Sequence, residues 1–186
     1  IDVINDDILQ VDENNISDEK LIVFGNLPYN ISTEILCKWI INLNDQKIWF
    51  RYFILMFQKE VADRIISKYN TSSYGRISVL TNWRLNVKKI IDIKPEAFSP
   101  RPKVESSLLF FTPKKIFPKL KEPKNLEKIT RIFFNQRRKM IKKPLKFLFK
   151  NYEEISSKLN LDLTLRPQNL NNLTYYKICE IYETSI

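Results

Sequence analysis

The sequence has 186 residues, of which 44% are hydrophobic and 28% charged, and its formal net charge is +10. This length suits one domain or a domain with a small appendage, and the lack of an 18-residue apolar run argues against a membrane span. Two cysteines, Cys37 and Cys179, without any histidine argue against a zinc site and a disulfide scaffold. With an acidic N-terminus and no visible signal peptide, we expect a cytoplasmic protein with buried thiols.

The first 20 residues carry seven acidic side chains and one lysine. We expect Val3 and Ile4 to end a strand, after which Asp7 lies at the strand's carboxyl edge. A carboxylate there can accept a hydrogen bond from an adenine amine, while the backbone N–H of Ile8 binds a ring nitrogen. The alternative is a solvated acidic loop.

A turn of six residues, Gly25 to Asn30, is the most informative stretch of the chain. It follows Leu21–Phe24, an apolar run that predicts a buried strand, and it precedes a Ser/Thr start signal that opens a helix over Ser32–Ile41. The turn therefore lies at the carboxyl end of a strand. Open α/β sheets bind their ligands at this end.

The side chains of this turn suit one particular chemistry. The Asn26 side-chain oxygen and the Leu27 carbonyl, held by Pro28, offer two acceptors to the two hydrogens of an exocyclic amine. Accepting both would free the nitrogen lone pair from the ring. Tyr29 offers a face on which a base can stack. The alternative is a plain strand-to-helix turn, since Asn and Pro are common turn residues.

Alternating strand and helix patterns continue to about residue 93. Trp49–Phe57 predicts a buried strand of a mostly parallel sheet. Gln58–Ile66 predicts a helix, Ser72–Arg76 a turn that opens another helix, and Asn86–Ile93 a further strand.

A proline-rich loop over residues 95–106 interrupts this pattern and precedes the last predicted strand, Ser107–Phe111. Its three prolines hold the loop extended. Phe98 can therefore lie opposite Tyr29, so that a base is sandwiched between two rings. The alternative for Phe98 is an ordinary core aromatic.

From Lys114 onwards the chain becomes basic and helical. We expect a domain boundary there, with the C-terminal part of a catalytic domain over residues 1–113 and a helical domain over 114–186. The net charge from Lys114 to Lys150 is +12, and five cations fall within residues 137–143. Such clustering favours a polyanionic partner, because arginines suit phosphate forks and lysines act as point charges. The alternative is a lysine-rich surface that serves solubility.

Taken together, the motifs of this chain resemble those of the ribosomal RNA adenine dimethyltransferase family, in particular its small-subunit branch. The resemblance runs from about Ile4 to Ile181. It rests on five motifs in one order: Gly25-Asn-Leu-Pro-Tyr-Asn-Ile-Ser-Thr33, Gln58-Lys-Glu-Val61, Tyr74-Gly-Arg76, Ala97-Phe-Ser-Pro-Arg-Pro-Lys-Val104 and Phe134-Asn-Gln-Arg-Arg-Lys139.

The resemblance implies an α/β fold, a Rossmann-like class I methyltransferase domain followed by a small all-α domain. It implies S-adenosylmethionine as cofactor and dimethylation of the N6 amines of two adjacent adenines in small-subunit rRNA, with a role in ribosome biogenesis. We expect a monomer that binds this rRNA or its assembly intermediate, with no metal and no membrane.

The resemblance also implies roles for individual residues. Asn26 and the Leu27 carbonyl, with Pro28, would hold the target amine, and Tyr29 and Phe98 would sandwich the base. Asp7, Ile8 and Asn26 would contact the cofactor. RNA would be bound by seven cationic residues, namely Arg101, Lys103, Arg137, Arg138, Lys139, Lys142 and Lys143.

One departure from the family pattern bears on activity. The chain has two glycines, Gly25 and Gly75, and therefore no Gly-x-Gly cofactor loop. We expect the N-terminal strands and the cofactor loop to be missing, the strand at Leu21–Phe24 to present an unpaired edge with uncovered apolar faces, and S-adenosylmethionine not to bind tightly to this chain, which alone would be inactive.

Two alternative functions stay open. One is a non-catalytic rRNA-binding or ribosome-assembly factor, which the missing loop favours. The other is a large-subunit rRNA adenine methyltransferase of the kind that confers antibiotic resistance, although residues 134–139 and 166–170 favour the small-subunit branch. A relative recruited to mitochondrial transcription is less favoured, because no transit peptide is seen.

Overall fold

The computed structural model describes residues 1–43 and 48–185. By packing, the chain divides into two units: Ile1–Ala62 with Leu85–Lys114, and Asp63–Arg84 with Lys115–Ile186. The domain boundary expected after residue 113 stays a prediction. The division by packing differs from this expectation in one respect: residues 63–84 group with the C-terminal helices.

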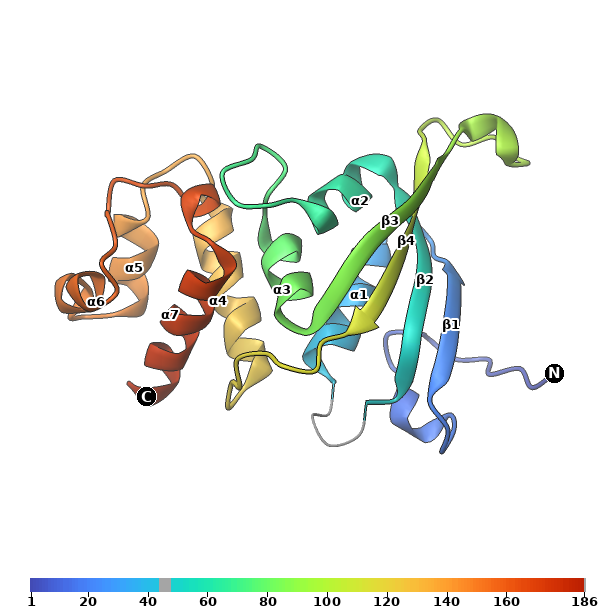
Figure 1. Cartoon of the computed structure of the whole chain (residues 1–186), viewed down its shortest axis with the longest axis horizontal. Coiled ribbons are helices and arrows are strands. Elements are labelled where there is room, and N and C mark those ends of the chain that lie inside the picture. Colours follow the sequence, from blue (N-terminus) through green and yellow to red (C-terminus); the bar gives the residue numbers. More distant parts are fainter. Residues whose placement is uncertain (44–47, 186) are drawn as a thin grey trace. The chain divides into compact units, whose positions relative to one another are not determined.

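The first unit contains a four-stranded sheet in the order β1-β2-β4-β3 (Figure 1). Its strands are β1 (Leu21–Asn26), β2 (Phe50–Gln58), β3 (Leu85–Ile93) and β4 (Ser106–Pro113). β1 and β2 are parallel, whereas β2–β4 and β3–β4 are antiparallel, so the expectation of a mostly parallel sheet was wrong. The reason is that the loop over residues 94–105 returns the chain directly beside β3, whereas a parallel neighbour would need a crossover.

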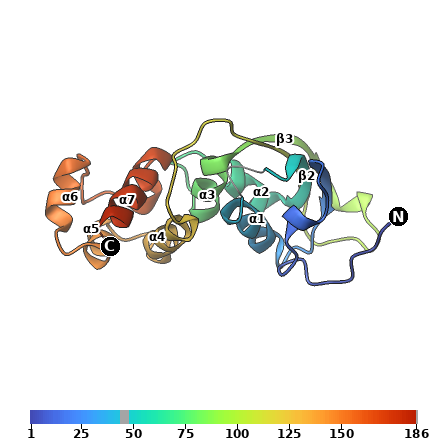
Figure 2. The ribbon, with the colours of Figure 1, turned by 90° about the horizontal axis from the view of Figure 1, so that it is seen from below.

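Helix α1 (Ser32–Ile41) lies on one side of the sheet (Figures 1 and 2) and has the predicted bounds. The Trp39 ring packs against the rings of Phe53 and Trp49, at centroid distances of 5.0 and 5.7 Å. The start signal works differently from the expected cap. Ile31 occupies the N-cap position, and the Ser32 hydroxyl donates to the Tyr29 carbonyl at 3.2 Å. This bond ties the helix start to the turn before it.

Strand β1 is an edge strand with one exposed apolar face. The side chains of Ile22 and Phe24 are 45% and 71% exposed, because no described strand or helix covers them. The prediction of a buried strand was therefore wrong, and the prediction of an unpaired edge with an uncovered apolar face is confirmed for the described residues. Val3 and Ile4 are also exposed and lie outside the described strands, contrary to expectation, because no strand pairs with them.

The second unit consists of helices packed around one apolar core. Phe133 and Tyr175 meet there with their ring centroids 5.4 Å apart, and Ile129 and Ile178 are fully buried. Helix α2 (Lys59–Ile66) follows β2 in the chain. The helices after it are α3 (Arg76–Arg84), α4 (Pro123–Asn135), α5 (Lys142–Leu148), α6 (Tyr152–Lys158) and α7 (Asn172–Thr184).

Both thiols are buried, as predicted: Cys37 in α1 and Cys179 in α7. Burial raises the pKa of the Cys179 thiol well above its usual value. Over residues 1–43 and 48–185, no helix is both long and apolar enough to cross a membrane.

Candidate functional site

An open cavity of about 320 Å³ lies at the carboxyl end of β1, within the first unit. It brings together five residues that the sequence analysis singled out, from the turn after β1 and from the proline-rich loop. Its lining consists of Asn26, Leu27, Pro28, Tyr29, Met56, Phe98, Pro100 and Pro102. Residues 70 positions apart in the sequence therefore share one cavity.

Backbone geometry at the end of β1 fixes the position of the turn. Asn26 is the last residue of β1 and lies opposite Met56 of β2. The Pro28 carbonyl accepts from the backbone N–H of Ile31 at 3.1 Å, which closes the turn in front of α1. Gly25 leaves room for the packing beneath, since a Cβ there would lie 2.7 Å from Cδ2 of the buried Leu55.

A hydrogen bond to the next-but-one strand holds the Tyr29 ring. Its phenol oxygen lies 2.6 Å from the Ser106 hydroxyl, and Ser106 is the fully buried first residue of β4. The sequence analysis did not single out Ser106. The available signal was a pair of serines at the start of an apolar strand, and that signal does not identify their partners.

The loop that carries Phe98 has structure of its own. Residues Pro95–Ala97 form a 3-10 turn, and the backbone N–H of Phe98 donates to the Pro95 carbonyl at 3.2 Å. The Arg101 guanidinium forms an ion pair with Glu96 in the same loop. Neither Arg101 nor the exposed Lys103 lines the cavity. Of the three predicted site residues in this loop, Phe98, Arg101 and Lys103, only Phe98 lines the cavity, together with Pro100 and Pro102.

Lys59, the first residue of α2, anchors the far end of this loop. Its backbone N–H donates to the Glu105 carbonyl at 2.9 Å, and its ammonium forms an ion pair with the Glu105 carboxylate. The hydrogen bond from this ammonium to the Glu105 carboxylate raises the pKa of Lys59 above its usual value. Asp92 of β3 lies 3.6 Å from the same ammonium. The hydrogen bond from the Ser107 hydroxyl, followed by that from Lys89, lowers the pKa of Asp92.

Asp7 and Ile8 do not line the cavity. The Asp7 carboxylate accepts from the backbone N–H of Leu9 at 2.9 Å, and its carbonyl accepts from those of Gln10 and Val11, so Asp7 closes its own turn. The Ile8 carbonyl accepts from the Lys38 ammonium at 2.8 Å. Their expected contact with a cofactor stays a prediction.

A buried charge cluster that sequence analysis missed attaches this N-terminal segment to α1. The Glu13 carboxylate is 2.6 Å from both the Lys38 ammonium and the Trp39 indole nitrogen. Glu13 is 5% exposed. Its place in an acidic stretch predicts a solvated loop, and only the long-range contact with α1 identifies it as buried.

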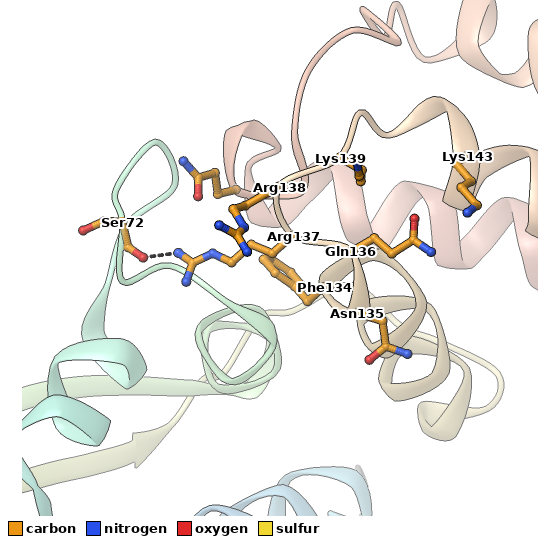
Figure 3. Close-up of a pocket in the computed structure, with 9 residues that line it drawn as sticks. Ser72, Phe134, Asn135, Gln136, Arg137, Arg138, Lys139 and Lys143 are labelled. Atoms are coloured by element: carbon orange, nitrogen blue, oxygen red, sulfur yellow. Dashed lines mark hydrogen bonds between the residues drawn. The ribbon is translucent and has the colours of Figure 1, made fainter.

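A second, larger cavity of about 750 Å³ lies in the helical unit (Figure 3). It lies where α4 ends and the basic segment, residues 137–143, begins. Its lining consists of Ser72, Phe134, Asn135, Gln136, Arg137, Arg138, Lys139, Lys143 and Gln168. Four of the seven predicted RNA-binding residues are thus brought together, while the exposed Lys142 is not part of the lining. Ser72 and Gln168 were not among the predicted site residues, although both lie in segments that the sequence analysis used, the turn at 72–76 and the stretch 166–170.

Arg137 is engaged differently from its neighbours. Its guanidinium donates to the backbone carbonyls of Ser72 and Tyr74, the latter at 2.9 Å, as the dashed line to Ser72 in Figure 3 indicates. Arg138 and Lys139, by contrast, are exposed. Arg137 therefore holds the loop before α3 in place, and the exposed cations beside it are available to an anion.

Comparisons with known proteins agree over almost the whole chain. A family model described as ribosomal RNA adenine dimethylase matches residues 1–185. The ribosomal RNA small subunit methyltransferase A of Pelagibacter ubique (strain HTCC1062) is 65% identical over 183 residues, which cover 98% of this chain and 70% of the relative. That of Ehrlichia ruminantium (strain Gardel) is 45% identical over 168 residues, covering 89% of this chain and 62% of the relative. The chain thus spans about two thirds of the length of these relatives.

Solved structures identify the fold. A dimethyladenosine transferase from Plasmodium falciparum superposes with a TM-score of 0.69 at 22% identity, covering 91% of this chain and 70% of that one. The 23S rRNA methyltransferase ErmE gives a TM-score of 0.60 at 18% identity, covering 95% and 71%. The expected α/β, Rossmann-like methyltransferase fold is confirmed.

Proposed function

Because the chain belongs to the ribosomal RNA adenine dimethylase family, we propose that it is part of an enzyme that dimethylates two adjacent adenines of small-subunit rRNA at N6, with a role in ribosome biogenesis. The names of its relatives support the small subunit as substrate. The observation that carries the proposal is the cavity in which Asn26, Tyr29 and Phe98 meet.

In this proposal the turn after β1 aims the target amine. The Asn26 side-chain oxygen and the Leu27 carbonyl each accept one hydrogen of the adenine N6 amine. The nitrogen lone pair, otherwise delocalised into the ring, then points towards the methyl donor. The nitrogen can lose its proton to water after the methyl group has been accepted, so no general base is required. Positioning is then the main source of rate, and a misplacement of about 1 Å costs about 100-fold.

Two rings bind the base in the same cavity. Stacking on one aromatic side chain is worth about 1–3 kcal/mol, and extruding a base from its stack costs a few kcal/mol. Tyr29 and Phe98 together therefore offset the extrusion. One ring alone would leave the flipped base a minor species.

S-adenosylmethionine, which the family uses, supplies the methyl group in the whole enzyme. The described residues do not fit a complete site for it. Asp7 closes its own turn and lies outside the lining of the cavity, and the chain contains no Gly-x-Gly. We therefore assign to this chain the methyl-accepting side of the reaction.

The basic cavity of the helical unit is proposed to bind rRNA phosphates. Arg138, Lys139 and Lys143 line it, and Lys142 lies beside Lys143 at the start of α5. Exposed Lys and Arg side chains release counterions when they neutralise phosphates, so this contact should depend on salt. The expected monomeric state and cytoplasmic location stay predictions.

A non-catalytic rRNA-binding or assembly factor remains the second candidate. The observation that favours it is that the described residues around the cavity do not form a complete cofactor site. Such a factor would use the basic cavity and would need no methyl donor.

The proposal is tested with Asn26→Ala in an enzyme of the relatives' full length that contains this chain. The substitution removes one of the two acceptors, and we expect turnover to fall about 100-fold while RNA affinity stays within a few-fold. Methyl transfer to small-subunit rRNA and RNA binding by fluorescence anisotropy measure the two quantities.

Asn30→Ala is the matched control. Asn30 is an exposed asparagine of the same turn that does not line the cavity, so its loss should change neither quantity. A large loss of affinity with normal turnover for Asn26→Ala would contradict the proposed role of Asn26. If the unchanged enzyme binds the RNA but transfers no methyl group to it, the non-catalytic assembly factor is the better account.

A further inference from the structure

A small cavity of about 200 Å³ adjoins the basic cavity of the helical unit. The two cavities share three polar side chains, those of Asn135, Gln136 and Lys143. The small cavity adds an apolar wall made of Ile132, Pro144 and Phe147. The shared polar side chains thus lie between the basic cavity and the small cavity with its apolar wall, which is called the recess below.

The volumes of the two cavities suit different parts of one ligand. Pockets for drug-sized molecules measure about 300–1,000 Å³. The small cavity, at about 200 Å³, is below this range and suits a single ring system, whereas the cationic cavity, at about 750 Å³, has room for a sugar-phosphate segment.

Phe147 is the unusual member of the apolar wall. Its side chain is 75% exposed, although Pro144 and Leu145 of the same short helix are buried. A single exposed apolar side chain needs no explanation by itself. Phe147 differs in that its ring lines a recess whose other side carries two amides and an ammonium group.

We propose that this recess binds one unstacked base of single-stranded RNA, with Phe147 as the stacking surface and the adjoining backbone phosphate on Lys143. The Asn135 and Gln136 amides can each donate to and accept from a base edge. Aromatic stacking beside a cationic groove is the usual way in which proteins hold single strands. The inference rests on the proposed rRNA-binding role of the helical unit and adds a base contact to it.

Charge favours RNA over an apolar peptide as the occupant. Residues 137–143 contain five cationic and no acidic side chains, and Arg138, Lys139 and Lys143 line the adjoining cavity. A peptide would need a dense acidic stretch next to its apolar anchor. A nucleotide carries the required charge and the ring on one unit.

The test is binding of the 186-residue chain to a fluorescein-labelled 12-nucleotide RNA of mixed sequence, as a single strand and as a duplex, over a range of salt concentrations. Phe147→Ala should weaken single-strand binding about 5- to 150-fold, the equivalent of one lost base stack. It should leave duplex binding and the salt slope unchanged. Phe147→Trp should retain or strengthen single-strand binding, which a purely structural role would not predict.

Two matched variants separate stacking from charge and from general surface effects. Lys143→Gln should reduce the magnitude of the salt slope for the single strand by about 0.7, because one phosphate contact is lost. Leu173→Ala removes another exposed apolar side chain of the helical unit, 61% exposed and outside both cavities, and should change nothing.

The inference is overturned if Phe147→Ala binds the single strand within twofold of the unchanged chain, or if it weakens single strand and duplex equally. The former result would leave the recess to a partner other than RNA. Neither result depends on methyl transfer, so this binding experiment and the turnover of Asn26→Ala can fail independently of each other.

Discussion

Tyr29 is held from two sides, and this matters for a ring that is to receive a base. Its carbonyl accepts from Ser32 of α1, and its phenol oxygen bonds to the hydroxyl of Ser106 in β4. Since Ser106 also begins the strand that follows the Phe98 loop, one hydrogen bond links the positions of the two rings that line the cavity. Ser106 is thus a positioning residue.

We predict that Ser106→Ala loosens the Tyr29 ring and raises KM more than it lowers kcat, because stacking acts on bound substrate and transition state alike. Loss of one hydrogen bond, about 1 kcal/mol, corresponds to about a fivefold change in kcat/KM. Steady-state kinetics on small-subunit rRNA, with an enzyme of the relatives' full length, measures the split.

Ser107→Ala is the control for this prediction. Ser107 is equally buried in the same strand, but its hydroxyl donates to Asp92 and not to Tyr29. Identical kinetics for the two variants would mean that Ser106 acts only through the stability of β4.

At the residue scale, the sequence identified the residues that line the cavity better than the buried residues that hold the surrounding structure in place. Asn26–Tyr29 carry their chemistry in their side chains and spacing, and Phe98 is conspicuous within a proline-rich loop. Ser106 and Glu13 could not be found in this way, because a serine or a glutamate acquires its role from a partner more than 20 residues away.

Charged side chains anchor the far end of the loop over residues 94–105. Asp92 and Glu105 both approach the Lys59 ammonium, and all three groups are partly exposed. The contribution of Asp92, whose pKa is lowered in the fold, is present above its unfolded pKa of about 3.9 and is lost as the pH falls through the lower folded value. That of Lys59, whose pKa is raised, is present below about pH 10.4 and is lost as the pH rises through the higher folded value.

We therefore predict that Lys59→Met lowers the Tm by a constant amount between about pH 5 and pH 9, and that this difference shrinks below about pH 4 as the carboxylates are protonated. Circular dichroism melts at several pH values measure it. Lys103→Met, which removes an exposed lysine from the same loop, should show no difference. If the Tm difference between Lys59→Met and the unchanged chain is the same at pH 3 and pH 7, Lys59 acts by packing and not by charge.

The basic segment after α4 combines two roles in adjacent residues. We predict that Arg138→Gln weakens RNA binding and reduces the magnitude of the salt slope by about 0.7 for a single strand. Arg137→Gln should leave the slope unchanged and instead speed hydrogen exchange over residues 72–74, because Arg137 donates to the carbonyls of Ser72 and Tyr74. Equal salt slopes for both variants and the unchanged chain would show that this segment does not contact phosphates.

At the element scale, periodicity predicted most helices and strands to within a few residues. α1 begins and ends as expected, and β3 begins one residue before the predicted strand. Pairing direction was not predictable in the same way, because it depends on contacts between distant segments. β2 is apolar enough for a parallel sheet, yet it pairs antiparallel with β4.

At the scale of the whole molecule, composition and charge distribution were the informative features. The change to a basic, helical pattern at Lys114 predicted a domain boundary there, and the net charge of +12 from Lys114 to Lys150 predicted a polyanionic partner. Both stay predictions. The grouping of residues 63–84 with the C-terminal helices could not be predicted, because it follows from side chains such as Tyr176, whose hydroxyl donates to the Val79 carbonyl at 3.1 Å.

The most direct test of the central claim is nucleoside analysis of small-subunit rRNA after incubation with S-adenosylmethionine and an enzyme of the relatives' full length that contains this chain. We predict N6,N6-dimethyladenosine at two adjacent positions, and its loss in the Asn26→Ala variant. Methylation of another base or of ribose, or unchanged dimethylation by Asn26→Ala, would contradict the assignment of this cavity to the target adenine.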